Sequence, residues 1–307
     1  MHSKRNSLIE IFRLLAAFWV CYYHSYSLVT KGSYFSNGRI AVDFFFIVSG
    51  LFLFNLLKKY DDEPFFKGTL HFMRDRFKPL MVTFLICWSF ALINFFTVDL
   101  PNGNYIIPWG YLWYVPHLLL IELSIYVLRR LVKQNVIFLI IVGLASVACF
   151  VITLTRVSNY GLIRGFAAIP LGMFLSLIPE IKEKYRQAIS IPITIVVFIC
   201  IFLISYFLPI PKYEDPLMIL VLFPVLLYFA KQVNFKNRIV NGFCSISFGV
   251  YCYQEVVDFF RERNILKTSW IMFIIILTLA IVDVLAKQVF FLIREKKKQK
   301  QAILLNE

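Results

Sequence analysis

Long uninterrupted apolar segments dominate this chain. Ten of them are close to the roughly 20 residues that an α-helix needs to cross the hydrocarbon core of a bilayer. Their apolar residues do not alternate with polar ones, so the pattern indicates helices and not the strands of a membrane barrel. We therefore predict an all-α, polytopic integral membrane protein with about ten transmembrane helices. The segments are 7–29, 38–58, 78–98, 109–129, 135–155, 161–178, 188–208, 216–232, 239–260 and 268–293.

The composition and the distribution of charge support this prediction. Hydrophobic residues make up 60% of the 307 residues and charged residues only 16%, whereas soluble domains average about 45–50% and about 25%. The net charge of +14 comes from Lys and Arg residues between the apolar segments, so we expect no nucleic-acid partner. Of the 32 Lys and Arg residues, 22 lie at the N-terminus and after the even-numbered segments, and 8 lie in the opposite loops. The positive-inside rule then predicts that both termini are cytoplasmic.

The chain shows no linker and no internal repeat. We predict one membrane domain, residues 1–294, followed by a basic cytoplasmic tail, 295–307, that lies against anionic lipid. All the cysteines lie inside apolar segments without the paired spacing of a metal site, so we expect no metal and interpret them as small buried apolar residues. They are Cys21, Cys87, Cys149, Cys200, Cys244 and Cys252.

Ionisable residues inside predicted spans are costly, so each is a candidate functional residue. Arg13 and His24 in the first span are 11 residues apart. That spacing places them on one helix face and separates them by roughly 16 Å along the axis. A guanidinium suits phosphate, and an imidazole suits proton transfer near neutral pH. The alternative is that Arg13 extends to the interface and His24 bonds a neighbouring backbone group.

Asp43 enters the second span from the outer side, at a depth close to that of His24 on the adjacent antiparallel helix. A carboxylate there would orient the imidazole and raise its basicity, so we predict His24 as a general base and Asp43 as its partner. The alternative is that Asp43 caps the second helix.

A basic cluster precedes the third span on the cytoplasmic side. Arg74, Arg76 and Lys78 lie within five positions, and such a cluster can hold a polyphosphate ligand. The alternative is simple contact with lipid headgroups.

Two further ionisable residues are candidates for contact with the acceptor. His117 lies at a depth near that of His24, and Arg164 enters the sixth span from outside, where it would bind an anionic group. The alternatives are a structural role for His117 and an interface anchor for Arg164. Glu122 is five positions from His117 and so lies on a different face of the fourth helix; we expect it to be structural.

Six segments of the chain resemble the motifs of the membrane acyltransferase-3 family, the bacterial O-acyltransferases. The first two, R-x10-H and V-D-x-F-F-x-x-S-G, are the most specific, and the matches are ordered along most of the chain. The remaining four are R-x-x-P, L-W-F/Y, R…G and S-x-G-x-Y. The matching segments are Arg13 with His24, 42–50, 76–79, 112–114, 164–172 and 247–251.

Two positions depart from the family pattern. A second Arg usually stands three residues before Arg76, where this chain has Met73 with Arg74 beside it. The late motif commonly ends in His, where this chain has Gln254. An amide can still hydrogen-bond a substrate but cannot carry a proton at neutral pH.

The resemblance implies an enzyme that moves an acyl group, most often acetyl, from coenzyme A to a hydroxyl of a cell-envelope glycan. The protein would lie in the bacterial cytoplasmic membrane, with acetyl-CoA as a substrate and no permanently bound cofactor. The phosphates of the donor would bind Arg13 and the basic cluster, and the pantetheine arm would extend toward His24. We expect direct transfer to the acceptor hydroxyl, with the acceptor held by His117, Arg164 and Gln254.

Two other classes of protein also fit ten spans with buried charges. One is a non-catalytic transporter of a polysaccharide or a lipid-linked sugar, although no interrupted helix pair or repeat supports it. The other is a structural subunit of a polysaccharide synthase. Specific binding of acetyl-CoA distinguishes the enzyme from both.

Overall fold

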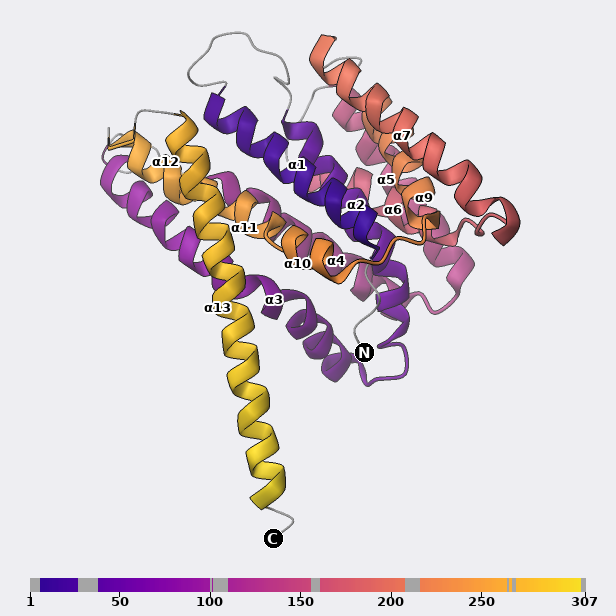
Figure 1. The fold of residues 1–307 in the computed structure, drawn as a ribbon. Coiled ribbons are helices and arrows are strands. Elements are labelled where there is room, and N and C mark those ends of the chain that lie inside the picture. The colour runs from indigo at the N-terminus through magenta and orange to yellow at the C-terminus, as the bar shows by residue number, and fades with distance from the viewer. Residues whose placement is uncertain are drawn as a thin grey trace.

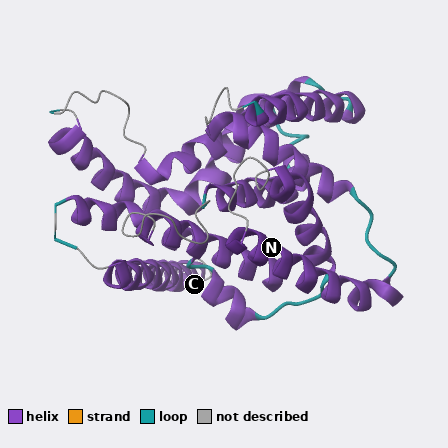
Figure 2. Ribbon diagram, turned by 90° about the horizontal axis from the view of Figure 1, so that it is seen from above, coloured by secondary structure: helices purple, strands orange, loops and turns teal. Residues whose placement is uncertain are grey.

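The computed structural model describes residues 6–26, 38–99, 101, 110–155, 161–207, 216–263, 265–266 and 269–304. Within these ranges every regular element is a helix (Figures 1 and 2), which confirms the all-α prediction. The helices are α1 (Ser7–Tyr26), α2 (Arg39–Lys58), α3 (Phe65–Asn94), η1 (Phe95–Asp99), η2 (Gly110–Trp113), α4 (Tyr114–Leu131), α5 (Asn135–Leu154), α6 (Gly161–Leu177), α7 (Glu183–Phe207), η3 (Met218–Leu222), α9 (Phe223–Gln232), α10 (Arg238–Cys244), α11 (Ser247–Cys252), α12 (Gln254–Glu262) and α13 (Ser269–Leu304).

Helices occupy all ten predicted segments in order. Five of them are long and apolar enough to cross a membrane by length and composition: Arg39–Lys58, Phe65–Val98, Asn135–Leu154, Glu183–Phe207 and Ile271–Phe290. Two shorter apolar helices cover Gly161–Leu177 and Met218–Gln232. The count of ten spans stays a prediction, because several of the remaining helices are short or carry charges.

The third and ninth segments differ most from the sequence pattern. α3 begins at Phe65, directly after Pro64 at its N-cap, and continues through Pro79. The basic cluster therefore lies inside a helix and not in a loop before it. The ninth segment is divided into α10, α11 and α12, with breaks at 245–246 and at Tyr253. Hydrophobicity alone does not reveal such breaks, because the segment as a whole stays apolar across them.

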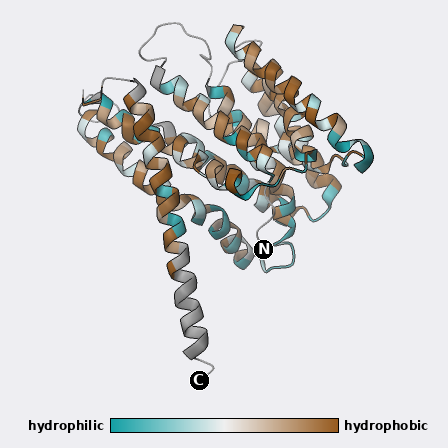
Figure 3. Ribbon diagram, viewed as in Figure 1, coloured by the Kyte–Doolittle hydropathy of each residue, from teal (hydrophilic) through white to brown (hydrophobic). Residues whose placement is uncertain are grey.

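Exposed apolar side chains cover the outer faces of the bundle. On α5 the exposed fraction is 67% for Leu144 and 63% for Val147, and on α7 it is 58% for Val196. Figure 3 shows hydrophobic residues along most of both helices and along the upper part of α13. A soluble protein does not expose so much contiguous apolar surface, so these faces are suited to lipid.

α2 is the central helix of the bundle. Figure 1 shows α1 and α2 in the middle, with α5, α6, α7 and α9 on one side and α3, α12 and α13 on the other. Most of the α2 side chains are buried. Its closest neighbour is α6, which it meets through two glycines: a Cβ atom added to Gly50 would lie 1.9 Å from the carbonyl oxygen of Ile169, and one added to Gly172 would lie 1.9 Å from that of Ile47. Small residues allow helices in membranes to approach this closely.

We expect Gly172→Ala to destabilise the protein, because the new methyl group meets backbone atoms of α2 that cannot move aside independently. Overpacking of this kind costs about 1–3 kcal/mol, and contact with backbone favours the upper end. Thermal unfolding of the detergent-solubilised protein measures the effect. Gly242→Ala is the matched control, since a Cβ atom there meets nothing within 4 Å. Equal unfolding midpoints for the two variants would contradict the packing argument.

Candidate functional site

A cavity of about 180 Å³ lies between α1, α2, α3, α4 and α11. Its polar lining comes from six residues: Arg13, Ser49, Arg76, Tyr114, Ser247 and Tyr251. The other lining residues are Phe45, Val48, Phe52, Pro79, Leu80, Leu118 and Phe248. Five of the six segments singled out by their sequence motifs contribute to this lining. Segments up to 238 positions apart in the chain therefore meet at one place.

Helical spacing explains which side chains face the cavity. On α2 the lining residues are Phe45, Val48, Ser49 and Phe52, which are separated by three or four positions and so lie on one face. The same spacing relates Arg76, Pro79 and Leu80 on α3, Tyr114 and Leu118 on α4, and Ser247 and Tyr251 on α11.

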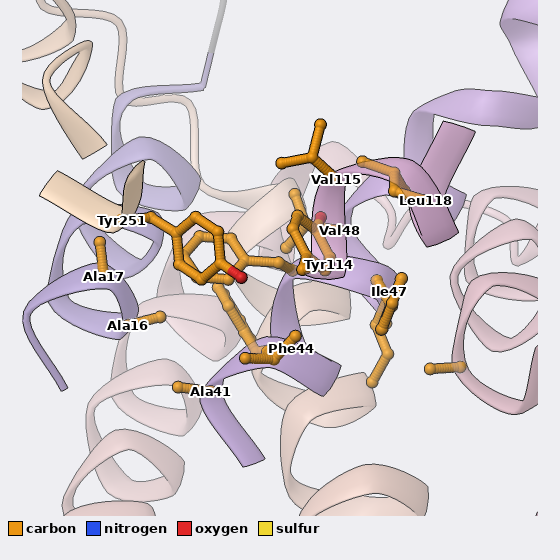
Figure 4. Close-up of a cluster of buried hydrophobic side chains, with 14 of the residues drawn as sticks. Ala16, Ala17, Ala41, Phe44, Ile47, Val48, Tyr114, Val115, Leu118 and Tyr251 are labelled. Carbon is orange, nitrogen blue, oxygen red and sulfur yellow. The ribbon is translucent and has the colours of Figure 1, made fainter. Parts of the chain in front are cut away.

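Three aromatic rings pack together at this cavity. The ring of Tyr251 lies edge-on to that of Tyr114, with their centroids 5.6 Å apart. Phe45 packs against both rings, at 6.3 Å from Tyr251 and 5.9 Å from Tyr114. Figure 4 shows Tyr251 and Tyr114 side by side, with Val48 of α2 next to Tyr114. These three packed rings give the cavity a largely aromatic wall.

Arg13 lies on α1 and forms an ion pair with Glu10, one turn earlier on the same helix. Its Nη1 atom is 3.1 Å from one carboxylate oxygen of Glu10 and 3.2 Å from the other. The Arg13 side chain is one-third exposed (33%), whereas the Glu10 side chain is buried. Arg13 thus keeps part of its guanidinium open to the cavity.

Arg76 lies in a buried cluster with Glu122 of α4 and Ser49 of α2. Nε of Arg76 donates to Oε2 of Glu122 at 2.6 Å, and Nη2 donates to Oε1 of Glu122 and, at 2.9 Å, to Oγ of Ser49. The Ser49 hydroxyl donates to Oε1 of Glu122 at 2.6 Å. Glu122, which we expected to be structural, is thus the ion-pair partner of Arg76, which we predicted to bind the donor.

Arg74 and Lys78, the other two residues of the basic cluster, are exposed and are not among the residues that line the cavity. Arg74 lies 3.5 Å from the carboxylate of Asp75. Asp75 also accepts a hydrogen bond of 2.7 Å from Lys59, which raises the pKa of the Lys59 ammonium above its ordinary value. The structure therefore separates Arg76 from its two basic neighbours, whose role in binding the donor stays a prediction.

Asp43 has a different charged partner from the one expected. Its carboxylate forms a buried ion pair with Arg164 of α6, with Nε of Arg164 3.1 Å from Oδ1 and Nη2 bonded to Oδ2. Nη2 of Arg164 also donates to the carbonyl of Arg39 at 3.2 Å. Both side chains are at most 5% exposed. Among the described residues, Arg164 and not His24 is thus the charged partner of Asp43, because α2 packs more closely on α6 than on the outer end of α1.

His24 lies near the C-terminal end of α1, 11 residues after Arg13 on the same helix, and is not among the residues that line the cavity. Its imidazole packs against the ring of Tyr23 at a centroid distance of 5.0 Å and is partly buried. Arg261 of α12, which forms an ion pair with Asp258, lies within electrostatic range of His24. Sequence patterns do not single out the proximity of His24 and Arg261, since both residues lie near a predicted end of a span.

His117 and Gln254 do not line the cavity. The Nδ1 atom of His117 hydrogen-bonds the carbonyl oxygen of Trp113 in the preceding turn. Gln254 is buried, and its Nε2 donates to the carbonyl of Val250 at 3.3 Å, while its Oε1 has no partner among the described residues. Their roles in binding an acceptor stay predictions.

A second, larger cavity lies on the other side of α1. It has a volume of about 430 Å³ and an almost entirely apolar lining from α1, α2, α7 and α9, including Phe12, Trp19, Phe44 and Phe198. The neighbouring residues Phe44 and Phe45 of α2 face the two different cavities. α1 and α2 thus form the wall between an apolar cavity and a polar one.

Residues 6–287 match a family model described as an acyltransferase domain. The chain belongs to the acyltransferase-3 family. No curated protein and no solved structure matches it. The match covers more than nine-tenths of the acyltransferase and confirms the resemblance carried by its six motifs. Together with the apolar outer faces, it indicates a membrane protein that transfers acyl groups.

Four polar residues of the site had no assigned role before the structure was known. Ser49, Tyr114, Ser247 and Tyr251 lie in the family motifs, so the motifs were the signal that could have identified them. Glu122 had a weaker signal, a carboxylate within a predicted span.

Proposed function

We propose that this protein is an integral membrane O-acyltransferase that uses cytoplasmic acyl-CoA, most often acetyl-CoA, to acylate a hydroxyl of a cell-envelope or exported polysaccharide. It would span the cytoplasmic membrane of a bacterium ten times, with both termini in the cytoplasm. The family assignment favours acyl transfer over transport of a glycan.

The observation that carries the proposal is the convergence of five motif-bearing segments on one cavity with two arginines. The cavity begins beside Arg13, in the second turn of α1, which is the cytoplasmic end in the proposed topology. A donor that enters from that side would place its phosphates near Arg13, Arg74 and Lys78. The thioester would then point toward the outer half of α1, where His24 lies.

The reaction needs one base and one leaving group. The acceptor hydroxyl attacks the thioester carbonyl and gives its proton to His24 as the C–O bond forms and the C–S bond breaks. The proton then passes to the departing thiolate, so that free coenzyme A and the ester are the products. His117 and Gln254 remain candidates for contact with the acceptor. Asp43 and Arg164 would contribute by holding α2 against α6.

Replacing Arg13 with alanine is expected to weaken binding of acetyl-CoA. The loss of one charge-assisted hydrogen bond to phosphate corresponds to about 1.5–3 kcal/mol. Isothermal titration of the purified protein with acetyl-CoA measures the change. Arg186→Ala is the matched control, because Arg186, in the first turn of α7, pairs with Glu180 at a distance of 3.0 Å and does not line the cavity. Unchanged affinity in the Arg13 variant would assign this residue to membrane topology alone.

A further inference from the structure

Glu122 is the buried centre of a cluster that joins three helices beside the cavity. Its side chain is 0% exposed and accepts three hydrogen bonds, two from Arg76 and one from Ser49. α4, α3 and α2 each supply one of these residues. Arg76 and Ser49 also line the cavity, so the cluster forms part of its wall.

The cluster carries no net charge. The carboxylate of Glu122 binds the guanidinium of Arg76 through two nitrogen atoms, and such pairing is what makes two charges tolerable in a buried site. A phosphate at Arg76 would have to displace this carboxylate or lie beside it, and the repulsion between the two anions opposes both arrangements. This part of the cavity therefore favours an uncharged ligand.

One side of the Arg76 guanidinium remains available to a ligand. Nε and Nη2 are engaged by Glu122 and Ser49, whereas Nη1 has no hydrogen-bond partner among the residues that the structure describes. The Arg76 side chain is 26% exposed. Because the guanidinium is planar, fixing two of its nitrogens also fixes the direction of the N–H groups on the third. The rings of Tyr114 and Tyr251 line the same cavity.

We propose that Glu122 is a positioning residue, which holds Arg76 as an oriented, charge-compensated donor for the amide carbonyls of the pantetheine arm of acyl-CoA. The phosphates bind elsewhere, at the cytoplasmic end near Arg13. This inference rests on the proposed use of acyl-CoA. It assigns different parts of one ligand to the two arginines of the cavity.

Two probes separate the two parts of the donor. S-acetylpantetheine carries the thioester and both amides without phosphate, and adenosine 3′,5′-bisphosphate carries adenosine and phosphates without the pantetheine arm. We expect Arg76→Ala to weaken binding of S-acetylpantetheine about ten-fold or more, the loss of a hydrogen bond to a charged group, and to leave binding of the bisphosphate unchanged. Glu122→Gln should have the same selective effect, because it releases Arg76 from its fixed orientation. The control variant is Arg186→Ala, because Arg186 does not line the cavity, and it should leave binding of S-acetylpantetheine unchanged.

The opposite assignment makes opposite predictions. If Arg76 binds phosphate, Glu122→Gln removes the competing carboxylate and tightens binding of acetyl-CoA and of the bisphosphate, which would overturn the inference. Arg76→Lys keeps the charge but loses the planar geometry, so restored binding of S-acetylpantetheine in this variant would overturn it too. A purely structural role for Glu122 would lower the unfolding temperature and weaken both probes together.

The wild-type protein distinguishes this inference from the proposed function. Absence of acetyl-CoA binding by the folded wild type would overturn the use of acyl-CoA and the inference with it. Normal binding of acetyl-CoA, with unchanged affinity for S-acetylpantetheine in the Arg76→Ala and Glu122→Gln variants, would overturn the inference alone. Should Arg76→Ala fail to fold, Arg76→Lys and Glu122→Gln decide the question by themselves.

Discussion

Replacing His24 with alanine is expected to lower the turnover of acyl transfer by roughly 10²–10⁴, the usual contribution of a general base. Binding of acetyl-CoA should persist, because Arg13 lies 11 residues away on the same helix, roughly 16 Å along its axis. Acylation of the glycan is measured per folded molecule that binds coenzyme A. The variant therefore separates the chemical step from recognition of the donor.

The matched control is His71→Ala. His71 lies in the N-terminal part of α3, where its Nδ1 atom is 2.7 Å from the carboxylate of Glu63, and the His71→Ala protein should retain near-normal turnover. A histidine that only packs in the bundle would, when truncated, lower stability and donor binding together. Wild-type turnover in the His24→Ala protein would remove His24 from the mechanism.

Breaking the ion pair between Asp43 and Arg164 is expected to destabilise the protein strongly. Either single alanine variant removes one half of a buried ion pair, a change that typically costs about 3–5 kcal/mol. The double variant Asp43→Leu with Arg164→Met should regain much of this loss, because replacing both charges leaves neither unpaired. Thermal unfolding in detergent measures all three variants. Removal of the exposed Arg186–Glu180 pair is the control and should change stability by less than about 1 kcal/mol.

The same variants test the expected role of Asp43 in orienting His24. If Asp43 acts on the imidazole, Asp43→Asn lowers turnover at unchanged stability, and Arg164→Ala does not reproduce the effect. If the ion pair holds α2 against α6, the Asp43 and Arg164 variants lose stability in parallel. The structure supports the second outcome, since Arg164 makes two hydrogen bonds to the Asp43 carboxylate.

The sequence predicted the positions of the helices well, because hydrophobicity and length are local properties. The division of the ninth segment at Tyr253 was not predictable in this way, since the bend depends on how α11 packs: a Cβ atom on Gly249 would lie 3.0 Å from that of Ala280 on α13. The start of α3 at Phe65 was also missed, since polar and charged residues interrupt the apolar residues in the first turns of this helix, and the segment is not apolar enough to be read as part of a span.

The candidate residues could be recognised from the sequence more easily than their partners. Arg13, Arg76, Asp43 and Arg164 stand out because charge in an apolar segment is costly. Which carboxylate meets which arginine depends on the order in which the helices pack. The depth argument that paired Asp43 with His24 is satisfied equally by Arg164, which also enters its span from the outer side. Only the close contact of α2 with α6 decides between them.

Some basic residues serve the fold as well as the topology. Arg130 was counted among the residues that orient the chain in the membrane. Its Nη1 atom donates to the carbonyls of Tyr60 at 2.6 Å and Asp61 at 2.7 Å and so fixes the connection between α2 and α3. Some of the basic residues counted for the positive-inside rule therefore also make structural contacts. A count of Lys and Arg does not distinguish these residues from those that only set the orientation of the chain.

The most direct test of the proposed function is transfer of labelled acetyl by the purified protein. The protein is reconstituted in lipid vesicles, supplied with acetyl-CoA labelled in the acetyl group, and incubated with polysaccharide from cells that lack the gene. The proposed function predicts label in alkali-sensitive ester linkage on the polysaccharide, with release of one free thiol per ester formed and loss of both signals in the His24→Ala protein. Binding of polysaccharide without acetyl transfer, or transfer that persists at the wild-type rate in the His24→Ala protein, would contradict it.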